Sequence, residues 1–160
     1  MSKPLAPCSK CKGQMSMTIH EPFQGEEGGL SLTIREMPCV VCDQGHKRFI
    51  NVGFAAQLLD LMANPETFQG IPGARKKGLF RKSYLCPDCA RELPESPTGQ
   101  RAQEVAAEIG KAQPFKVVLS IPVYKCSSCG GEHIRSADET ASLAFKATGH
   151  AYRAIDIHPN

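Results

Sequence analysis

Cys8-Ser-Lys-Cys11, Cys39-Val-Val-Cys42, Cys86-Pro-Asp-Cys89 and Cys126-Ser-Ser-Cys129 are four copies of one short unit, and they contain all eight cysteines of the chain. A Cys-x-x-Cys turn can present two thiolates to one tetrahedral metal ion, and two such turns complete a four-sulfur site. The sequence therefore predicts two metal sites.

Sequential pairing of these units is the simplest arrangement, because loops that close locally lose less chain entropy than a pairing across the whole sequence. Interleaved pairing, of the first unit with the third and the second with the fourth, stays open. A closed set of four thiolates suits a structural zinc ion, so two Zn²⁺ ions are the expected cofactors. The predicted ligands are Cys8, Cys11, Cys39 and Cys42 for one ion and Cys86, Cys89, Cys126 and Cys129 for the other.

The cysteines have other possible roles besides zinc ligation. Four thiolates also accept iron, as in a rubredoxin-like site. Cys-x-x-Cys units can act as redox-active thiol pairs, and single buried cysteines can serve as small apolar residues. The repeated spacing of all eight residues favours metal ligation over these alternatives.

The composition favours small units stabilised by metal. The chain has 160 residues, no Trp, 6% aromatic residues, 14 Gly and 12 Pro. Such a chain lacks the material for one large aromatic core, and small modules usually need a metal or disulfide to fold. We expect a small metal-stabilised α+β protein with two tandem zinc-ribbon or rubredoxin-like β-hairpin modules, each followed by a helix. Metal-free protein is expected to lose its tertiary structure.

The first module is predicted over residues 1–68. Apolar and polar residues alternate over 14–20 and again over 30–35, which predicts two strands of a hairpin around a Gly-rich loop. The ends of this hairpin would bring the first two cysteine units together. A short strand over 46–50 and a helix over about 52–63 follow.

The second module is predicted over residues 84–160. A strand over 115–123 leads into the last cysteine unit, and a helix over about 137–147 follows. Apolar residues at helical spacing also predict an additional helix near 99–111. Residues 69–83 are expected to be an exposed basic linker between the modules.

The positive charge of the chain is concentrated in that linker. The net charge is +3, and residues 71–85 contain five basic residues and no acidic one. Nucleic-acid binding through this segment, with Phe80 and Tyr84 available for stacking, is therefore an alternative function. A solvated linker is the plainer interpretation. The basic residues are Arg75, Lys76, Lys77, Arg81 and Lys82.

Two histidines occupy matching positions. His46 follows Cys42 by four residues, and His133 follows Cys129 by four residues, so an offset of 87 relates the two halves. This match predicts an internal duplication. We expect both histidines to lie in the second shell of the metals or on the surface, with direct ligation as the alternative.

The apolar stripe of the first predicted helix has two possible roles. Its residues can form part of a core, which is the more common case, or a docking surface for a protein. The residues concerned are Phe54, Leu58, Leu61 and Met62.

The first module resembles the amino-terminal zinc-binding module of MqsA-type antitoxins, the YgiT-type zinc finger. The resemblance covers residues 5–63, and residues 84–148 look like a divergent copy. It implies zinc ligation by the four matching cysteines and a protein-binding surface. In that family a helix-turn-helix DNA-binding domain follows the module, whereas here a second cysteine-rich module takes its place.

The expected function is that of a non-catalytic zinc protein that binds another macromolecule, most simply a protein. No Ser/His/Asp set, Gly-rich phosphate loop or mixed histidine and carboxylate motif is present in the sequence to support an enzyme. The chain lacks an apolar run of about 20 residues, so no membrane association is expected. The start of the sequence has no signal peptide, and a cytoplasmic location is expected.

Overall fold

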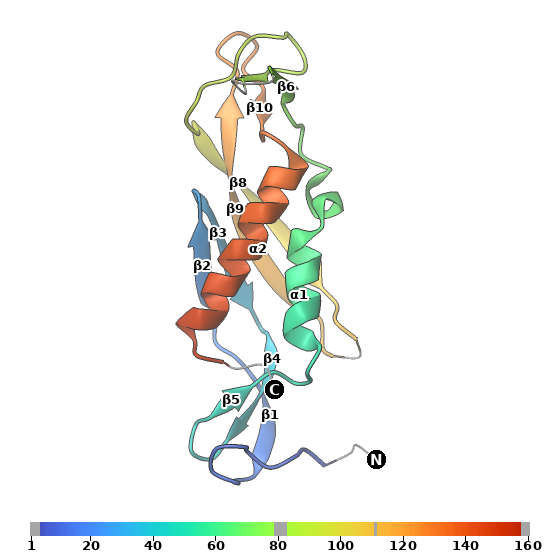
Figure 1. Cartoon of the computed structure of the whole chain (residues 1–160), viewed down its shortest axis with the longest axis vertical. Coiled ribbons are helices and arrows are strands. Elements are labelled where there is room, and N and C mark those ends of the chain that lie inside the picture. The colour runs from blue at the N-terminus through green and yellow to red at the C-terminus, as the bar shows by residue number, and fades with distance from the viewer. Residues whose placement is uncertain (1–3, 79–82, 111, 158–160) are drawn as a thin grey trace.

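The computed structural model describes residues 4–78, 83–110 and 112–157. It shows a small α+β fold with antiparallel sheets and two α-helices, as predicted. The molecule is elongated: a central sheet forms its middle, and smaller sheets form its two ends (Figure 1).

One end is a three-stranded sheet in the order β1-β4-β5. Its strands are β1 (Met15–Ile19), β4 (Pro38–Cys42) and β5 (Lys47–Arg48). The predicted hairpin between residues 14–20 and 30–35 is therefore wrong, because the first of these segments pairs with β4. The reason is an additional strand that the Gly-rich loop conceals. We call this part of the molecule, residues 4–20 and 37–50, the N-terminal metal end.

The central sheet contains that additional strand. β2 (Phe23–Glu27) and β3 (Leu30–Arg35) form a tight hairpin whose two turn residues, Gly28 and Gly29, have φ angles of 55° and 86°. Positive φ at both turn positions is what a two-residue hairpin with the usual strand twist requires, and glycine adopts it freely. The Gly-Gly pair thus makes a turn inside the segment predicted to be a loop.

The other strands of the central sheet come from the second half of the chain. They are β8 (Gly99–Ala107), β9 (Phe115–Lys125) and the short β10 (Glu132–His133). The predicted helix near 99–111 is therefore wrong: residues 99–107 pair with β9 along their whole length. Pairing with a long neighbouring strand here overrides an apolar spacing that also fits a helix.

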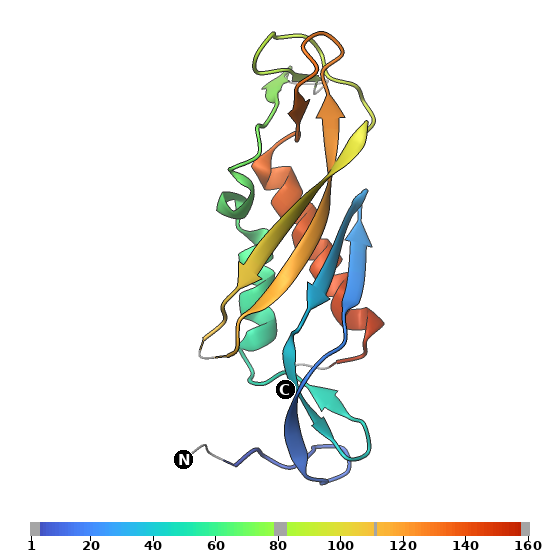
Figure 2. The same cartoon turned by 180° about the vertical axis from the view of Figure 1, so that it is seen from behind.

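Both helices pack on one face of the central sheet, and the opposite face is open (Figures 1 and 2). They are α1 (Phe54–Ala63) and α2 (Ala137–Ala154), and a short 3-10 helix, η1 (Pro65–Phe68), follows α1. Both predicted helices are present, and α2 continues seven residues beyond its predicted end at 147. Ser136 caps α2 by accepting a hydrogen bond from the Glu139 amide at 3.0 Å.

The two halves of the chain share this core. β3 pairs with β9, and one cluster of buried side chains runs from Phe23 in the first half to Ile157 in the second. The prediction of two modules, 1–68 and 84–160, therefore needs correction, since neither half has a main core of its own. Sequence periodicity did not reveal that β3 and β9 are neighbours, because pairing partners are not encoded in the alternation of either strand.

The opposite end of the molecule contains the predicted linker. The predicted exposed linker, residues 69–83, contains β6 (Arg75–Lys77), which is exposed and pairs with β7 (Ser83–Leu85) in a small ribbon. Phe80, Arg81 and Lys82 lie outside the described residues. The name distal metal end is used here for this ribbon together with the last two cysteine units and β10.

Candidate metal centres

Three of the four cysteine units form the same turn. In each, the amide of the fourth residue after the first cysteine donates to the carbonyl of that cysteine. The amide of the first cysteine in turn donates to the carbonyl of the fifth residue after it. The residue directly after the second cysteine has a positive φ in all three: Lys12 at 62°, Ala90 at 61° and Gly130 at 75°. The turn directs both sulfurs of a unit to one side. The first cysteines of these units are Cys8, Cys86 and Cys126.

The second unit, Cys39 to Cys42, differs because it lies in strand β4. Residues three apart in a strand point to opposite faces of the sheet. Cys39 belongs to the main core cluster, whereas Cys42 belongs to a separate small cluster with Cys8, Met15 and Val40. These two cysteines therefore cannot bind the same ion.

A tighter turn after β4 brings His46 close to Cys42. The Gly45 amide donates to the Cys42 carbonyl at 2.9 Å, and the Cys42 amide donates to the His46 carbonyl at 3.0 Å. Gly45 has a φ of 84°, which glycine adopts without strain. The turn thus places the imidazole where the other three turns place a second thiol.

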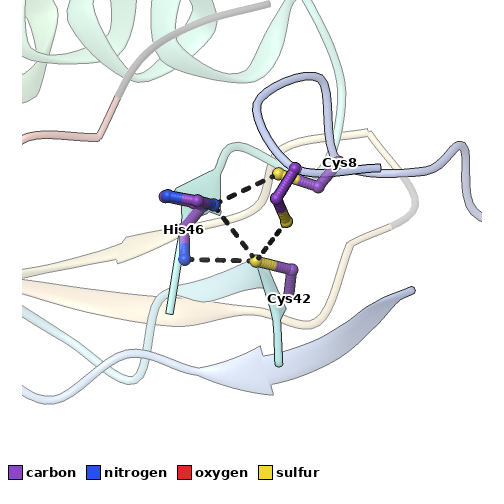
Figure 3. Close-up of side chains that lie close together, drawn as sticks. Cys8, Cys42 and His46 are labelled. Carbon is purple, nitrogen blue, oxygen red and sulfur yellow. Dashed lines mark hydrogen bonds between the residues drawn. The ribbon is translucent and has the colours of Figure 1, made fainter. Parts of the chain in front are cut away.

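The first candidate centre therefore consists of Cys8, Cys11, Cys42 and His46, whose donor atoms all lie within 4.8 Å of one another. The His46 Nδ1 atom lies 3.5 Å from the Cys8 sulfur and 3.4 Å from the Cys42 sulfur, and the imidazole points at both (Figure 3). The sulfurs of Cys11 and Cys42 are 3.7 Å apart. This arrangement is a three-sulfur, one-nitrogen set of metal ligands.

The prediction that Cys39 is a ligand is wrong. Its side chain is 0% exposed in the main core, and burial raises the pKa of its thiol. A metal ligand must be a thiolate, so this protonated, buried thiol serves as a small apolar residue. His46, predicted to lie in the second shell, instead takes the fourth ligand position. The sequence signal for it is the pair Gly45-His46, which follows Cys42 after two residues, in the turn that ends β4.

The second candidate centre contains the predicted four cysteines. The sulfurs of Cys86, Cys89, Cys126 and Cys129 all lie within 4.8 Å of one another. Cys86 and Cys129 are 3.6 Å apart, and Cys89 and Cys126 are 3.4 Å apart. Both centres thus follow sequential pairing within one half of the chain, and the interleaved alternative does not occur.

His133 lies beside the second centre, as predicted. Its Nε2 atom is 3.4 Å from the Cys86 sulfur and its side chain is almost fully buried. With four sulfurs already gathered, an Nε2–H that donates to Cys86 stabilises that thiolate from the second shell. Asp88 lies further from the same atom, at 3.9 Å.

Two thiols of the second centre have pKa values that are shifted in opposite directions. The backbone N–H of Cys129 lowers the pKa of the Cys126 thiol to about 6. The backbone N–H of Gly131 acts in the same direction on Cys129, but the neighbouring thiols of Cys86 and Cys126 outweigh it and raise the pKa of Cys129 to about 11. Sulfurs this close cannot all ionise unless a cation neutralises them, so the site is suited to a metal ion.

In the first centre, the thiol pKa of Cys8 is lowered as that of Cys126 is in the second. The backbone N–H of Cys11 lowers the pKa of the Cys8 thiol to about 6, in the same turn geometry as Cys126. This thiolate is therefore available to a metal at neutral pH. A repeated backbone turn thus prepares one sulfur in each centre.

The remaining predicted binding residues have mixed outcomes. Arg75, Lys76 and Lys77 are exposed on β6, whereas Arg81 and Lys82 lie outside the described residues. In α1, Phe54, Leu58 and Met62 are fully buried and Leu61 is half-buried against the same core, so this stripe is core and not a docking surface.

Among the described residues, neither helix has the length and apolar character needed to cross a membrane. Comparison of this chain with models of protein families, with curated proteins and with solved structures gave no match.

Proposed function

We propose that this chain is a non-catalytic zinc protein that holds one structural Zn²⁺ ion near each end and uses the resulting rigid body to bind another macromolecule. The observation that carries the proposal is the convergence of four soft donor atoms at two separate places. Such donor sets bind zinc tightly in closed tetrahedral sites.

The distances between donors support zinc. Zn–S bonds of about 2.3 Å and Zn–N bonds of about 2.0 Å at tetrahedral angles separate two sulfurs by about 3.8 Å and a sulfur from a nitrogen by about 3.5 Å. The corresponding separations here are 3.4 to 3.7 Å between sulfurs and 3.4 to 3.5 Å between sulfur and nitrogen. Both centres therefore need little rearrangement to accept the ion.

A structural role follows from the number of donors. Four protein ligands complete a tetrahedral zinc site and leave no position for a substrate or an activated water. A catalytic zinc normally has only three protein ligands. The ions are therefore proposed to hold the two ends in shape.

The tandem zinc-ribbon interpretation is part of this proposal. In each half a cysteine turn precedes a strand, an antiparallel strand leads into the second turn, and a short strand and a helix follow. β5 returns onto β4 as β10 returns onto β9. The hairpin β2–β3 is then an insertion into the first ribbon.

Nucleic-acid binding is a second candidate, supported by one observation. β6 exposes three successive cationic residues, Arg75 to Lys77, at the distal metal end. Retention on heparin that falls steeply with salt, and that is lost in Lys76→Glu/Lys77→Glu, would favour this function. No retention at low salt would eliminate it.

Elemental analysis combined with native mass spectrometry tests the zinc proposal. Protein purified without chelators should contain two zinc ions per chain and no visible chromophore. Iron with a red absorbance would indicate a rubredoxin-like electron carrier, and metal-free protein with reversible disulfides would indicate a thiol-redox protein. Either result would overturn the proposal.

A further inference from the structure

The strand β1 is an edge of its sheet. Among the described residues it pairs only with β4, so one side of β1 has unpaired backbone groups. In an antiparallel pair, the backbone N–H and C=O groups of successive residues point alternately toward the partner strand and away from it. The His20 amide donates to the Met37 carbonyl at 2.8 Å, so His20 points toward the partner strand. Met17 and Ile19, which are three residues and one residue away from it, therefore direct their N–H and C=O groups to the free edge.

The same two residues expose large apolar side chains. Met17 is 57% exposed and Ile19 is 46% exposed, whereas Met15 on the same strand is buried. A short edge with unpaired amides and adjacent apolar side chains is a template for an additional strand. Nothing within the described chain covers this edge.

Basic side chains outnumber acidic ones in the N-terminal metal end. Its residues 4–20 and 37–50 contain four cationic side chains and one acidic side chain, Asp43, while the exposed Glu21 and Glu36 lie just outside these ranges. Lys10 and Lys12 are exposed in the cysteine turn that leads directly into β1. Arg48 lies on the same face of the sheet as Met17, because both are opposite Val40 in the strand registers. The cationic residues are Lys10, Lys12, Lys47 and Arg48.

We propose that the free edge of β1 binds an extended acidic segment of a partner protein, which adds as a fourth strand beside Met17 and Ile19. This proposal rests on the macromolecule-binding role proposed above and specifies its partner. Backbone hydrogen bonds to residues 17 and 19 supply the register, apolar side chains of the segment cover the exposed pair, and its carboxylates lie near the lysines.

The charge also argues against a second copy of this chain as the occupant. Pairing of two β1 edges would bring two N-terminal metal ends of the same sign together, and like charges in an interface are unfavourable. A neutral apolar segment would gain nothing from Lys10 and Lys12. An acidic strand is the occupant that satisfies both the edge and its charge.

The test uses zinc-loaded full-length protein and a synthetic octapeptide in which glutamate alternates with valine. Binding should shift the amide NMR signals of Met17, Thr18 and Ile19 and should weaken with added salt. The same peptide with lysine in place of glutamate should not bind. Perturbation confined to other strands would overturn the proposal, as would dimerisation through β1 without peptide.

Matched variants separate the edge from the charge. Ile19→Pro removes an amide that is unbonded in the free strand, so the fold should persist while peptide affinity falls at least about tenfold. Lys10→Glu/Lys12→Glu should weaken binding similarly. Phe145→Ser and Lys146→Glu, which change another exposed apolar residue and another lysine on α2, should bind normally.

Each variant is first shown to keep two zinc ions, so the two proposals fail in different ways. Zinc content of two with no peptide binding would overturn only the edge proposal. A chain without zinc would overturn the proposed function itself. Equal binding by Ile19→Pro and the unchanged protein would also refute the fourth-strand geometry.

Discussion

Replacing His46 and Cys39 separately by alanine tests the reassignment of the first metal centre. The structure predicts that His46→Ala loses one of four ligands, whereas Cys39→Ala loses none. The second centre is unchanged in both variants, so its zinc ion is an internal reference. The two substitutions lie in the same end of the molecule, which makes each a control for the other.

The sizes of the two effects follow from the surroundings of each residue. A structural zinc site contributes roughly 10–16 kcal/mol of apparent binding free energy, so one ligand in four accounts for about 3 kcal/mol, or somewhat more than a hundredfold in affinity. Cys39→Ala removes one buried sulfur from the core, which should lower the free energy of unfolding by about 1 kcal/mol. Zinc affinity at the first centre should not change.

Titration with a chromogenic zinc chelator measures the outcome. The unchanged protein and Cys39→Ala should each release two zinc ions at high chelator concentration. His46→Ala should release one at a chelator concentration about a hundredfold lower and the other at the original concentration. If Cys39→Ala loses an ion readily and His46→Ala retains both, the conventional Cys39–Cys42 unit is the ligand and the reassignment is wrong.

Chelation of both metals should remove amide-exchange protection from β1, β4 and β10 but leave β3 and β9 protected. The reason is that the buried cluster around Cys8 and Cys42 is small, whereas the main core lies between the two metal ends. Loss of protection in all strands would contradict this prediction. Acidification should weaken zinc binding, and more steeply below pH 6 than above it. In the metal-free sites the lowered pKa values of Cys8 and Cys126 keep these thiolates present above about 6, whereas below it protons compete with the metal for them, so a zinc affinity that is the same at pH 7 and pH 5 in a chelator competition assay would refute the assignment. Gly25→Ala should lower the free energy of unfolding by about 3 kcal/mol or more, because the new Cβ would lie 2.0 Å from the Ala147 carbonyl oxygen of α2. Gly149→Ala is the control: its Cβ would have no neighbour within 4 Å, and alanine favours the helix, so the free energy of unfolding should rise by roughly 0.5–1 kcal/mol. Urea denaturation measures both values.

The sequence was sufficient to predict features that depend on local chemistry. Seven of the eight cysteines, Cys39 being the exception, belong to the two candidate centres, and the strand over residues 115–123 and both helices are present. Cysteine spacing and apolar periodicity report directly on ligand geometry and on one buried face. These signals do not depend on which elements become neighbours.

Features that depend on long-range pairing were not predictable in this way. The segment around Ala102 and Val105 has helical spacing, yet it is a strand because β9 offers it a partner of matching length. The division into two modules failed for the same reason, since the pairing of β3 with β9 joins them. The expectation that metal-free protein loses all tertiary structure depended on that division and is replaced by the chelation prediction above.

The strand registers also change how the proposed duplication is aligned. The sequence offset of 87 superposes Cys39 on Cys126 and His46 on His133. In the structure, however, the second turn of each half begins at Cys42 and at Cys126, an offset of 84. The pairs Val41 with Lys47 and Lys125 with Glu132 then occupy the same place beside that turn.

In this alignment the two histidines are not equivalent. Arg48 pairs with Val40 as His133 pairs with Tyr124, so His133 corresponds to Arg48. The turn after Cys42 is one residue shorter than the turn after Cys126, and in it His46 supplies the ligand that Cys129 supplies in the second centre. A shorter turn cannot present a second sulfur at the usual spacing, and a longer side chain compensates for the missing residue. The first centre then no longer needs Cys39 as a ligand, which explains how that cysteine can be buried in the core that joins the two halves.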